Sequence, residues 1–228
     1  GFYPCDYFMD KYYDDYLANT GDCKNVTEVY LRLRYGQCPI DDAKMMTVIT
    51  SKDKNCYVPP PPEGPLKKAY RALNEGQFRE AIAFYDQYLS TATDNNKKAD
   101  ILLRVSKIYY VHIKDFVKAR SYARNAANFR ANWGEPFILI GKLYASSGPL
   151  CGPGRGWDSQ IVTWPAIDKF RYAKKIDPSV AAEADKLIAQ YEQYMPSMED
   201  IFQRRLHKND DFMVECWIKE KTKIRPAL

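Results

Sequence analysis

From Leu66 onward, apolar residues recur at spacings of three and four, the period of helices that bury one face. The pattern comes in pairs of segments joined by short polar turns, and Asn74-Glu75-Gly76-Gln77 is the first such turn. The positions that define the first two pairs are small, aliphatic or aromatic: Ala69, Phe78, Ala81 and Tyr85, then Leu102, Val105, Ser106, Tyr109, Phe116, Ala119 and Ala126. Small side chains let paired helices approach closely while aromatic side chains fill the space beside them. The second pair has one extra residue in its turn, near Lys114.

A third pair is interrupted between its two helices. Its first helix is predicted from Phe137, Ile140, Gly141 and Tyr144, and its second from Ala166, Phe170, Ala173 and Pro178. An insertion at 146–165, rich in glycine, proline and tryptophan, stands where a tight turn is enough in the other pairs. A further helix over 180–194 and a short capping helix over 198–206 complete a helical repeat domain over 66–208. We expect Ala81, Ala119 and Ala166 to be buried in equivalent places.

The segments on either side of this domain differ from it. Residues 1–58 form a separate small helical region with three short helices, predicted from apolar residues at helical spacing. A proline-rich linker at 59–65 follows, because prolines donate no backbone hydrogen bond and favour polyproline II. Residues 209–228 form an extended C-terminal tail, because the period changes to two there: the alternating residues are Phe212, Val214, Cys216 and Ile218, with Met213, Glu215, Trp217 and Lys219 between and after them. One strand is not stable alone, so the tail must lie on the helices, pair with the insertion or pair with another chain.

Charge argues against a nucleic-acid partner. The chain of 228 residues has a net charge of +5. Residues 1–64 contain seven basic and ten acidic side chains, so the remainder has an excess of about eight positive charges spread over its length. A nucleic-acid site would gather them in a dense basic stripe.

Cysteine usage indicates an oxidising compartment. The six cysteines are widely separated and contain no C-x2-C pair, which disfavours zinc. Free buried thiols in a reducing cell are the alternative, and fifteen full pairings are open. No apolar run is long enough for a membrane span. We therefore expect an exported protein whose targeting segment has been removed.

The paired helices resemble tetratricopeptide repeats (TPR) over Leu66 to Pro178. A longer set of residues is similar to a family of exported bacterial TPR proteins: Cys151-Gly152, Trp164, Ala166, Asp168-Lys169-Phe170, Ala173-Lys174, Asp177-Pro178-Ser179, Glu183-Ala184, Lys186-Leu187-Ile188, Cys216-Trp217-Ile218, Thr222 and Arg225. The resemblance implies an all-α, right-handed TPR-like superhelix of about three helical hairpins plus capping helices, with a short extended C-terminal tail. It also implies a protein-interaction role in the periplasm or at the outer membrane.

Where that family has Gly-Trp-Ile in its tail, this chain has Cys216-Trp217-Ile218. The extra cysteine suggests a disulfide between Cys216 and Cys151 of the insertion, and two unrelated buried thiols are the alternative. Such a bridge closes a loop of about 65 residues and would stabilise the fold by about 4 kcal/mol in the chain-entropy model.

A binding groove is predicted on the first helix of each pair, which lines the concave face of a TPR superhelix. Helical periodicity brings forward six residues there: Lys67, Tyr70, Arg104, Lys107, Tyr110 and Lys142. A basic and aromatic lining suits an extended peptide with acidic side chains or a free carboxylate. Ordinary solvated side chains on a helical surface are the alternative.

The insertion offers a second candidate surface. Arg155, Trp157 and Trp164 could hold a sugar or a partner side chain, or the tryptophans could pin the loop to the scaffold. The loop lacks the Gly-Lys-Ser/Thr ending of a phosphate-binding loop. His112 and His207 lie far apart without a motif around either, so no catalytic residue, metal or cofactor is predicted.

The sequence thus favours a non-catalytic scaffold or adaptor of the cell envelope that binds an extended peptide. The alternative is a glycan- or peptidoglycan-binding accessory protein that uses the tryptophan-bearing insertion. Self-association through the tail is a further candidate, in which Phe212 to Ile218 pair between chains.

Overall fold

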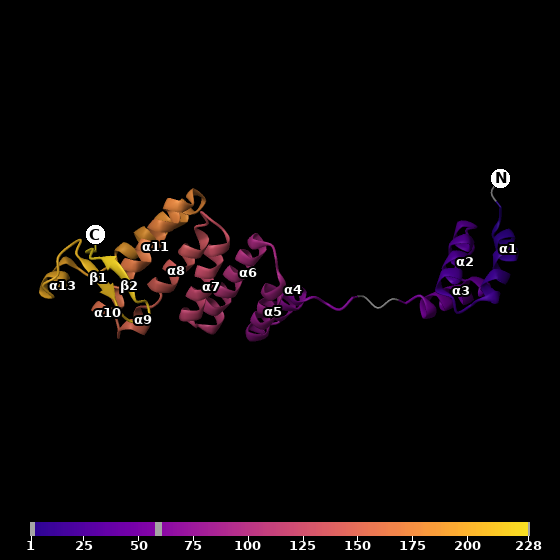
Figure 1. Ribbon diagram of the computed structural model, residues 1–228, viewed down its shortest axis with the longest axis horizontal. Coiled ribbons are helices and arrows are strands. Elements are labelled where there is room, and N and C mark those ends of the chain that lie inside the picture. Colours follow the sequence, from indigo (N-terminus) through magenta and orange to yellow (C-terminus); the bar gives the residue numbers. More distant parts are fainter. Residues whose placement is uncertain (1–2, 58–60, 228) are drawn as a thin grey trace. The chain divides into compact units, whose positions relative to one another are not determined.

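The computed structural model describes residues 3–57 and 61–227, most of them in helices, with one small two-stranded sheet (Figure 1). The chain divides into two compact units, Gly1–Pro62 and Glu63–Leu228. Each unit has its own core, and the two are described separately. Of the predicted linker, residues 59 and 60 lie outside the described residues, and residues 61–64 are not helical.

The first unit is a bundle of three short helices that contact one another. The helices are α1 (Cys5–Ala18), α2 (Cys23–Tyr35) and α3 (Ala43–Asn55). Their apolar stripes meet in a core that includes Val26, Leu33 and Met45, all fully buried. Asp22 and Asp42 cap α2 and α3, since each carboxylate accepts a hydrogen bond from a backbone amide in the first turn.

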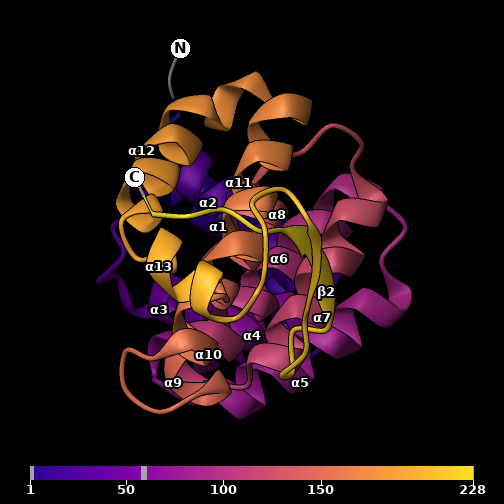
Figure 2. The same ribbon diagram turned by 90° about the vertical axis from the view of Figure 1, so that its left-hand side faces the viewer.

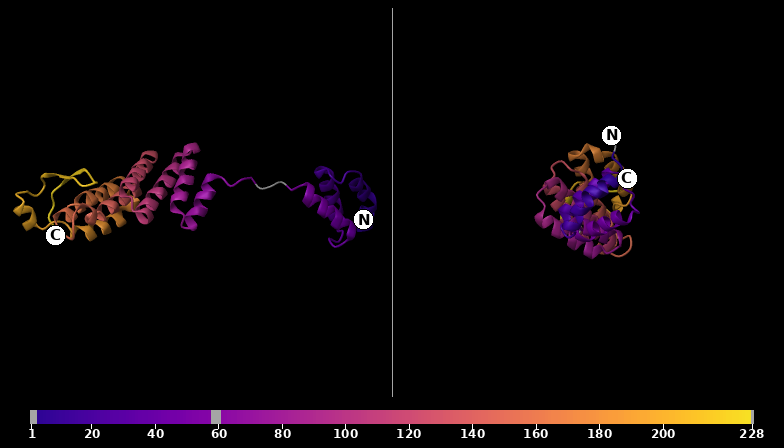
Figure 3. Two further views of the ribbon diagram at one scale, coloured as in Figure 1. Left: turned by 90° about the horizontal axis from the view of Figure 1, so that it is seen from below. Right: turned by 90° about the vertical axis from the view of Figure 1, so that its right-hand side faces the viewer.

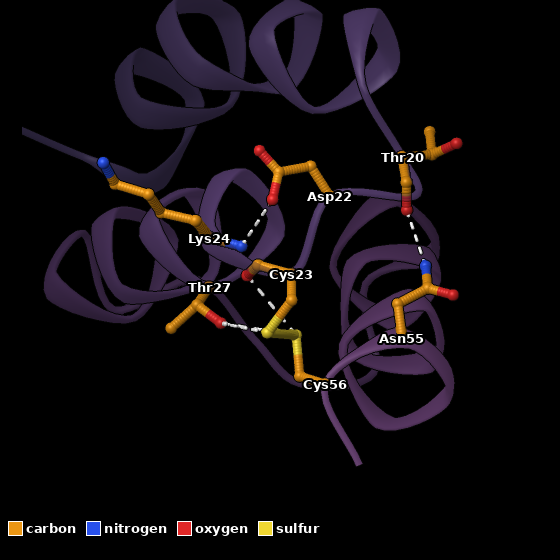
Figure 4. The surroundings of a disulfide bond; sticks show 7 residues. All are labelled: Thr20, Asp22, Cys23, Lys24, Thr27, Asn55 and Cys56. Atoms are coloured by element: carbon orange, nitrogen blue, oxygen red, sulfur yellow. Dashed lines mark hydrogen bonds between the residues drawn. A yellow bond between two sulfur atoms is a disulfide. The ribbon is translucent and has the colours of Figure 1, made fainter. Parts of the chain in front are cut away.

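Two disulfides close this unit. Cys5 is bonded to Cys38 and Cys23 to Cys56. The second bridge ties the start of α2 to the residue after α3, and Asn55 beside it donates a hydrogen bond of 2.7 Å to the carbonyl of Thr20 (Figure 4). A three-helix unit of this size has a small core, so covalent links contribute much of its stability.

The second unit is a succession of helical pairs, each packed on the pair before it (Figures 1 and 3). The first pair is α4 (Pro65–Asn74) with α5 (Phe78–Thr91), the second α6 (Asn95–Ile108) with α7 (Phe116–Phe129), and the third α8 (Glu135–Ala145) with α11 (Thr163–Ile176). A π-helical turn, η1 (Tyr109–Ile113), follows α6. A 3-10 turn, η2 (Pro178–Val180), leads into α12 (Ala181–Glu192), and α13 (Met198–Gln203) lies beyond it.

Small residues sit where the helices of a pair approach closely. Ala81, Ala119 and Ala166 are all fully buried, as expected, and each is the fourth residue of its helix. Ser106 is buried and donates a hydrogen bond of 2.6 Å to the carbonyl of Ala119. At Gly141, an added Cβ would lie 2.3 Å from Cε1 of Phe170, so only glycine fits this crossing without movement.

The insertion contains two short helical turns, α9 (Gly148–Cys151) and α10 (Trp157–Gln160), which pack against each other (Figure 2). Gly148 and Gly152 permit this contact, because an added Cβ at either would meet Ser159 or Asp158. A disulfide joins Cys151 to Cys216, the bridge considered from the sequence.

The tail forms a β-hairpin of β1 (Asp211–Val214) and β2 (Glu220–Lys223). The strands pair antiparallel, with Phe212 opposite Thr222 and Val214 opposite Glu220. The sequence predicted an extended tail that needed the helices, the insertion or another chain as its partner. In the structure the tail lies on the helices, since β2 packs on α11, and the partner of β1 is a second strand of the tail itself, which was not predicted.

Buried polar contacts hold the hairpin on the helices. Glu220 forms ion pairs with Lys169 (2.5 Å) and Arg124 (2.7 Å) and accepts a hydrogen bond from Tyr144. Burial opposes ionisation of Glu220, but the hydrogen bonds from Lys169 and Tyr144 outweigh it and lower the pKa of this carboxyl. Further along, Arg225 binds Asp168 at 2.7 Å.

Candidate functional site

A pocket of about 360 Å³ lies across the first helices of successive pairs. Its walls come from α4, α6, the residues before α8 and the start of α8. The lining residues are Tyr70, Asp100, Ile101, Leu103, Arg104, Lys107, Trp133 and Glu135. Three of the six predicted groove residues, Tyr70, Arg104 and Lys107, are therefore brought together in one place.

Arg104 is the cation of the pocket that is available to a ligand. Its guanidinium lies over the ring of Tyr70, 5.3 Å from the ring centre. Among the described residues, it forms no ion pair with a carboxylate. Lys107 differs, since its ammonium group lies 3.7 Å from a carboxylate oxygen of Glu135. Arg104 therefore keeps an uncompensated positive charge at the pocket wall.

A second guanidinium–aromatic pair borders the pocket. Arg130 stacks over Trp133 at 4.3 Å from the ring centre and holds Asp100 in an ion pair of 2.8 Å. The sequence predicted a basic and aromatic lining. The actual lining is mixed, but Asp100 and Glu135 each have a cationic partner, so the charge left over is that of Arg104.

A buried hydroxyl lies beside these groups. The ring of Tyr85 packs edge-on against Tyr70, with 5.8 Å between ring centres. Its hydroxyl is buried and has no hydrogen-bond partner within residues 3–57 and 61–227. Burial raises the pKa of Tyr85, and the nearby charge of Arg104 acts in the opposite direction. The hydroxyl thus stays neutral, and it lies behind Tyr70 without lining the pocket.

The other three predicted groove residues lie outside the pocket. Lys67 is mostly exposed and pairs with Glu63 at 3.2 Å. Lys142 pairs with Glu183 at 2.6 Å, and the Tyr110 hydroxyl lies 2.8 Å from Ser146 Oγ. Their existing partners occupy the groups that would have met a ligand.

The tryptophans of the insertion support the fold. Trp164 is fully buried and its indole N–H donates a hydrogen bond of 2.7 Å to the carbonyl of Arg225. Trp157 is half-buried, packs edge-on against Trp164 and Phe212, and has the guanidinium of Arg204 over its ring at 4.3 Å. Trp164 therefore offers no open face to a sugar, and the ring of Trp157 is partly covered. Arg155 is exposed.

The two histidines make different contacts, each with a residue of its own surroundings. The ring of His112 stacks on Phe78, with 3.8 Å between centres, and His207 lies 3.3 Å from a carboxylate oxygen of Asp210 on an exposed turn. Over the part of the chain that the structure describes, no three side chains of metal-ligating type are gathered at one place.

The disulfides indicate folding in an oxidising, exported compartment, because all six cysteines are bonded within the chain. None of the helices in the described residues is both long enough and apolar enough to cross a membrane. No family model matches the sequence, and none of the curated proteins is significantly similar to it.

Sequence reasoning missed Trp133, Asp100 and Glu135. Trp133 falls between two predicted helices, where helical periodicity cannot show which way a side chain points. Asp100 and Arg104 are four residues apart on one helix, a spacing that places them on the same face, and this signal could have identified Asp100.

Proposed function

We propose that residues 63–228 form a TPR-like, right-handed superhelical scaffold that binds an extended peptide in the pocket around Arg104. The protein would then be a non-catalytic adaptor of the bacterial cell envelope, in the periplasm or at the outer membrane. The observation that carries this proposal is an uncompensated guanidinium held over an aromatic ring, in a pocket that spans successive helical pairs.

Three features support the repeat assignment. The helices form pairs whose contacts are mainly with their immediate neighbours, which is the arrangement of a solenoid. Ala81, Ala119 and Ala166 recur at the same place in the second helix of each pair. Gly141 meets Phe170 at the crossing of the third pair, and Ser106 meets Ala119 at that of the second.

The chemistry of the pocket suits a peptide carboxylate. A guanidinium can hold a carboxylate through two parallel hydrogen bonds, and its contact with Tyr70 fixes its plane. Trp133 offers apolar surface for an adjoining side chain. The ligand would thus be a segment with a C-terminal or side-chain carboxylate next to an apolar residue.

A crosslinking pull-down from native envelope extract tests the proposal. The bait is the whole protein, compared with an Arg104→Glu/Lys107→Glu variant. A Lys175→Glu/Lys186→Glu variant is the matched control, because it makes the same change in charge at exposed positions on α11 and α12. We expect the wild type and the control to capture the same partner and the groove variant to lose it. If all three proteins capture the partner equally, the partner does not bind at the pocket around Arg104.

A further inference from the structure

A second pocket, of about 540 Å³, lies between the insertion and the end of α12. It is separate from the pocket around Arg104, with which it shares no lining residue. Its size falls within the roughly 300–1,000 Å³ of small-molecule sites. The lining residues are Ala145, Gly148, Pro149, Gly154, Arg155, Ser159, Gln160, Thr163, Tyr191, Gln193 and Tyr194.

The lining combines aromatic faces with many hydrogen-bonding groups. Tyr191 and Tyr194 lie next to each other, with 6.4 Å between ring centres and planes inclined by 56°. Tyr191 is held by stacking on Phe170, whereas Tyr194 is 54% exposed. Two tilted aromatic faces beside open space are suited to the apolar faces of sugar rings.

Amide groups supply the polar recognition. Gln193 donates through Nε2 to the carbonyl of Gln190, which leaves its Oε1 as an acceptor. The side-chain amide of Gln160 makes no hydrogen bond with any other described residue, so it has both donors and an acceptor to offer. Ser159 and Thr163 donate their hydroxyl protons to backbone carbonyls, and their lone pairs remain for a ligand.

Charge selects the ligand class. Arg155 is the one charged residue in the lining, and the described part of the chain gives it no carboxylate partner. One guanidinium matches a single carboxylate, whereas phosphate sites usually gather several cations or backbone amides. Two tyrosine faces, amides and one guanidinium together fit a sugar that has a carboxylate.

The insertion builds this site, and its form is fixed independently of any ligand. Trp157 and Trp164 pack the loop against Phe212, and the Cys151–Cys216 bridge ties it to the hairpin. This gives the interruption of the third pair a role that a tight turn could not fill. We propose that the pocket between the insertion and α12 binds a carboxylated saccharide, with Arg155 on the carboxylate and Tyr194 against the sugar ring.

Titration calorimetry of the whole protein with three probes tests this. Trigalacturonic acid carries uronic carboxylates, N-acetylmuramic acid carries the free lactyl carboxylate of the peptidoglycan sugar, and maltotriose is neutral. We expect at least one of the first two to bind at least about tenfold more tightly than maltotriose. Which of them binds tells whether the source is an acidic polysaccharide or peptidoglycan, and either result supports the proposal.

Variants locate the site. Arg155→Gln should lower the affinity for the carboxylated probe about tenfold, and Tyr194→Ala should do the same. Arg205→Gln is the matched control, since Arg205 is exposed and outside the pocket. Circular dichroism shows whether each variant is folded; both pocket residues are exposed, so folding should persist.

Several results would overturn the proposal: no binding of either carboxylated probe, equal binding of maltotriose, or unchanged affinity in Arg155→Gln. Loss of saccharide binding in Arg104→Glu/Lys107→Glu would also overturn it, because the sugar would then lie in the peptide groove. Retained saccharide binding in that variant, with loss of the peptide partner, separates the two sites.

Discussion

At the scale of single residues, the structure depends on a few positions where a small side chain is required by its neighbour. Gly141 and Phe170 are both fully buried and lie against each other in the third helical pair. Sequence spacing predicted the helices that contain them. It could not predict how closely their axes approach, because that distance is set by the packing of both helices at once.

Gly141→Ala should destabilise the second unit by about 1–2 kcal/mol. Alanine has the better helix propensity, but the destabilisation from overpacking is larger than that gain. The new Cβ would lie 2.3 Å from Cε1 of Phe170. Urea unfolding followed by circular dichroism measures the change. Gly64→Ala is the control within the same unit, since an added Cβ there meets nothing within 4 Å, and equal effects of the two changes would contradict the packing argument.

Glu220 makes the stability of the second unit depend on pH. Its folded pKa is lower than its ordinary value, despite burial, because Lys169 and Tyr144 hydrogen-bond the carboxylate. The stabilisation is therefore present above the unfolded pKa, near 4.5, and is lost as the pH falls through the lower folded value.

Glu220→Gln should lower the free energy of unfolding by about 2 kcal/mol near pH 7 and by much less at a pH below the folded pKa of Glu220, where the wild-type carboxyl is protonated. Denaturant unfolding of both proteins at each pH measures this. Other carboxyls, such as Asp177 and Asp211, titrate in both proteins and cancel in the comparison. A difference that is the same at both pH values would refute the role of the charge.

At the scale of elements, periodicity predicted the helical pairs well and the tail poorly. The second strand of the hairpin, Glu220–Lys223, has no apolar alternation to reveal it. The turn before it has positive φ angles at Cys216 and Lys219, neither of which is glycine or asparagine. The usual sequence signals of a hairpin were therefore missing.

The extra residue expected in the second pair appears as the π-helical turn Tyr109–Ile113, followed by Lys114 with φ of 61°. A π-turn accommodates one inserted residue in a helix without changing its direction. Only part of the candidate site could be predicted from the sequence. Helical periodicity shows which residues of one helix share a face, but Trp133 lies in a connection between helices, and periodicity does not give the path of a connection.

Deletion of Val111, which is exposed in the π-turn, should let the regular hydrogen-bond pattern continue and cost about 1 kcal/mol or less. Deletion of Arg104, which is also exposed but lies within α6, should lower the stability several times more. Removing one residue turns the helix segment after the deletion by about 100° relative to the segment before it, so the buried residues of the two segments no longer share a face. Thermal melting of the two deletion variants measures the difference. Equal losses would show that the π-turn is not an accommodated insertion.

At the scale of the whole molecule, the chain consists of two units with separate cores and separate disulfides. The first unit has two bridges over a small core, whereas the second has a larger core and one bridge between the insertion and the hairpin. The units should therefore respond differently to loss of a bridge.

Calorimetry should show two unfolding transitions. Cys5→Ala/Cys38→Ala should lower the stability of the first unit by about 3–4 kcal/mol, as expected for a loop of this length, and leave the other transition in place. Cys151→Ala/Cys216→Ala is the reciprocal control and should affect only the second unit. A single transition that shifts in both variants would mean that the units unfold together.

The most direct test of the peptide-binding groove uses the indole N–H signals of the four tryptophans in nuclear magnetic resonance spectra. Trp133 lines the groove pocket, whereas Trp157, Trp164 and Trp217 lie outside it. On addition of hexapeptides that contain Asp or Glu and end in a free carboxylate, the account predicts that the Trp133 signal moves. It also predicts that the other three signals stay and that Arg104→Glu abolishes the response. A Trp133 signal that does not move, or that moves equally in the variant, would contradict the account.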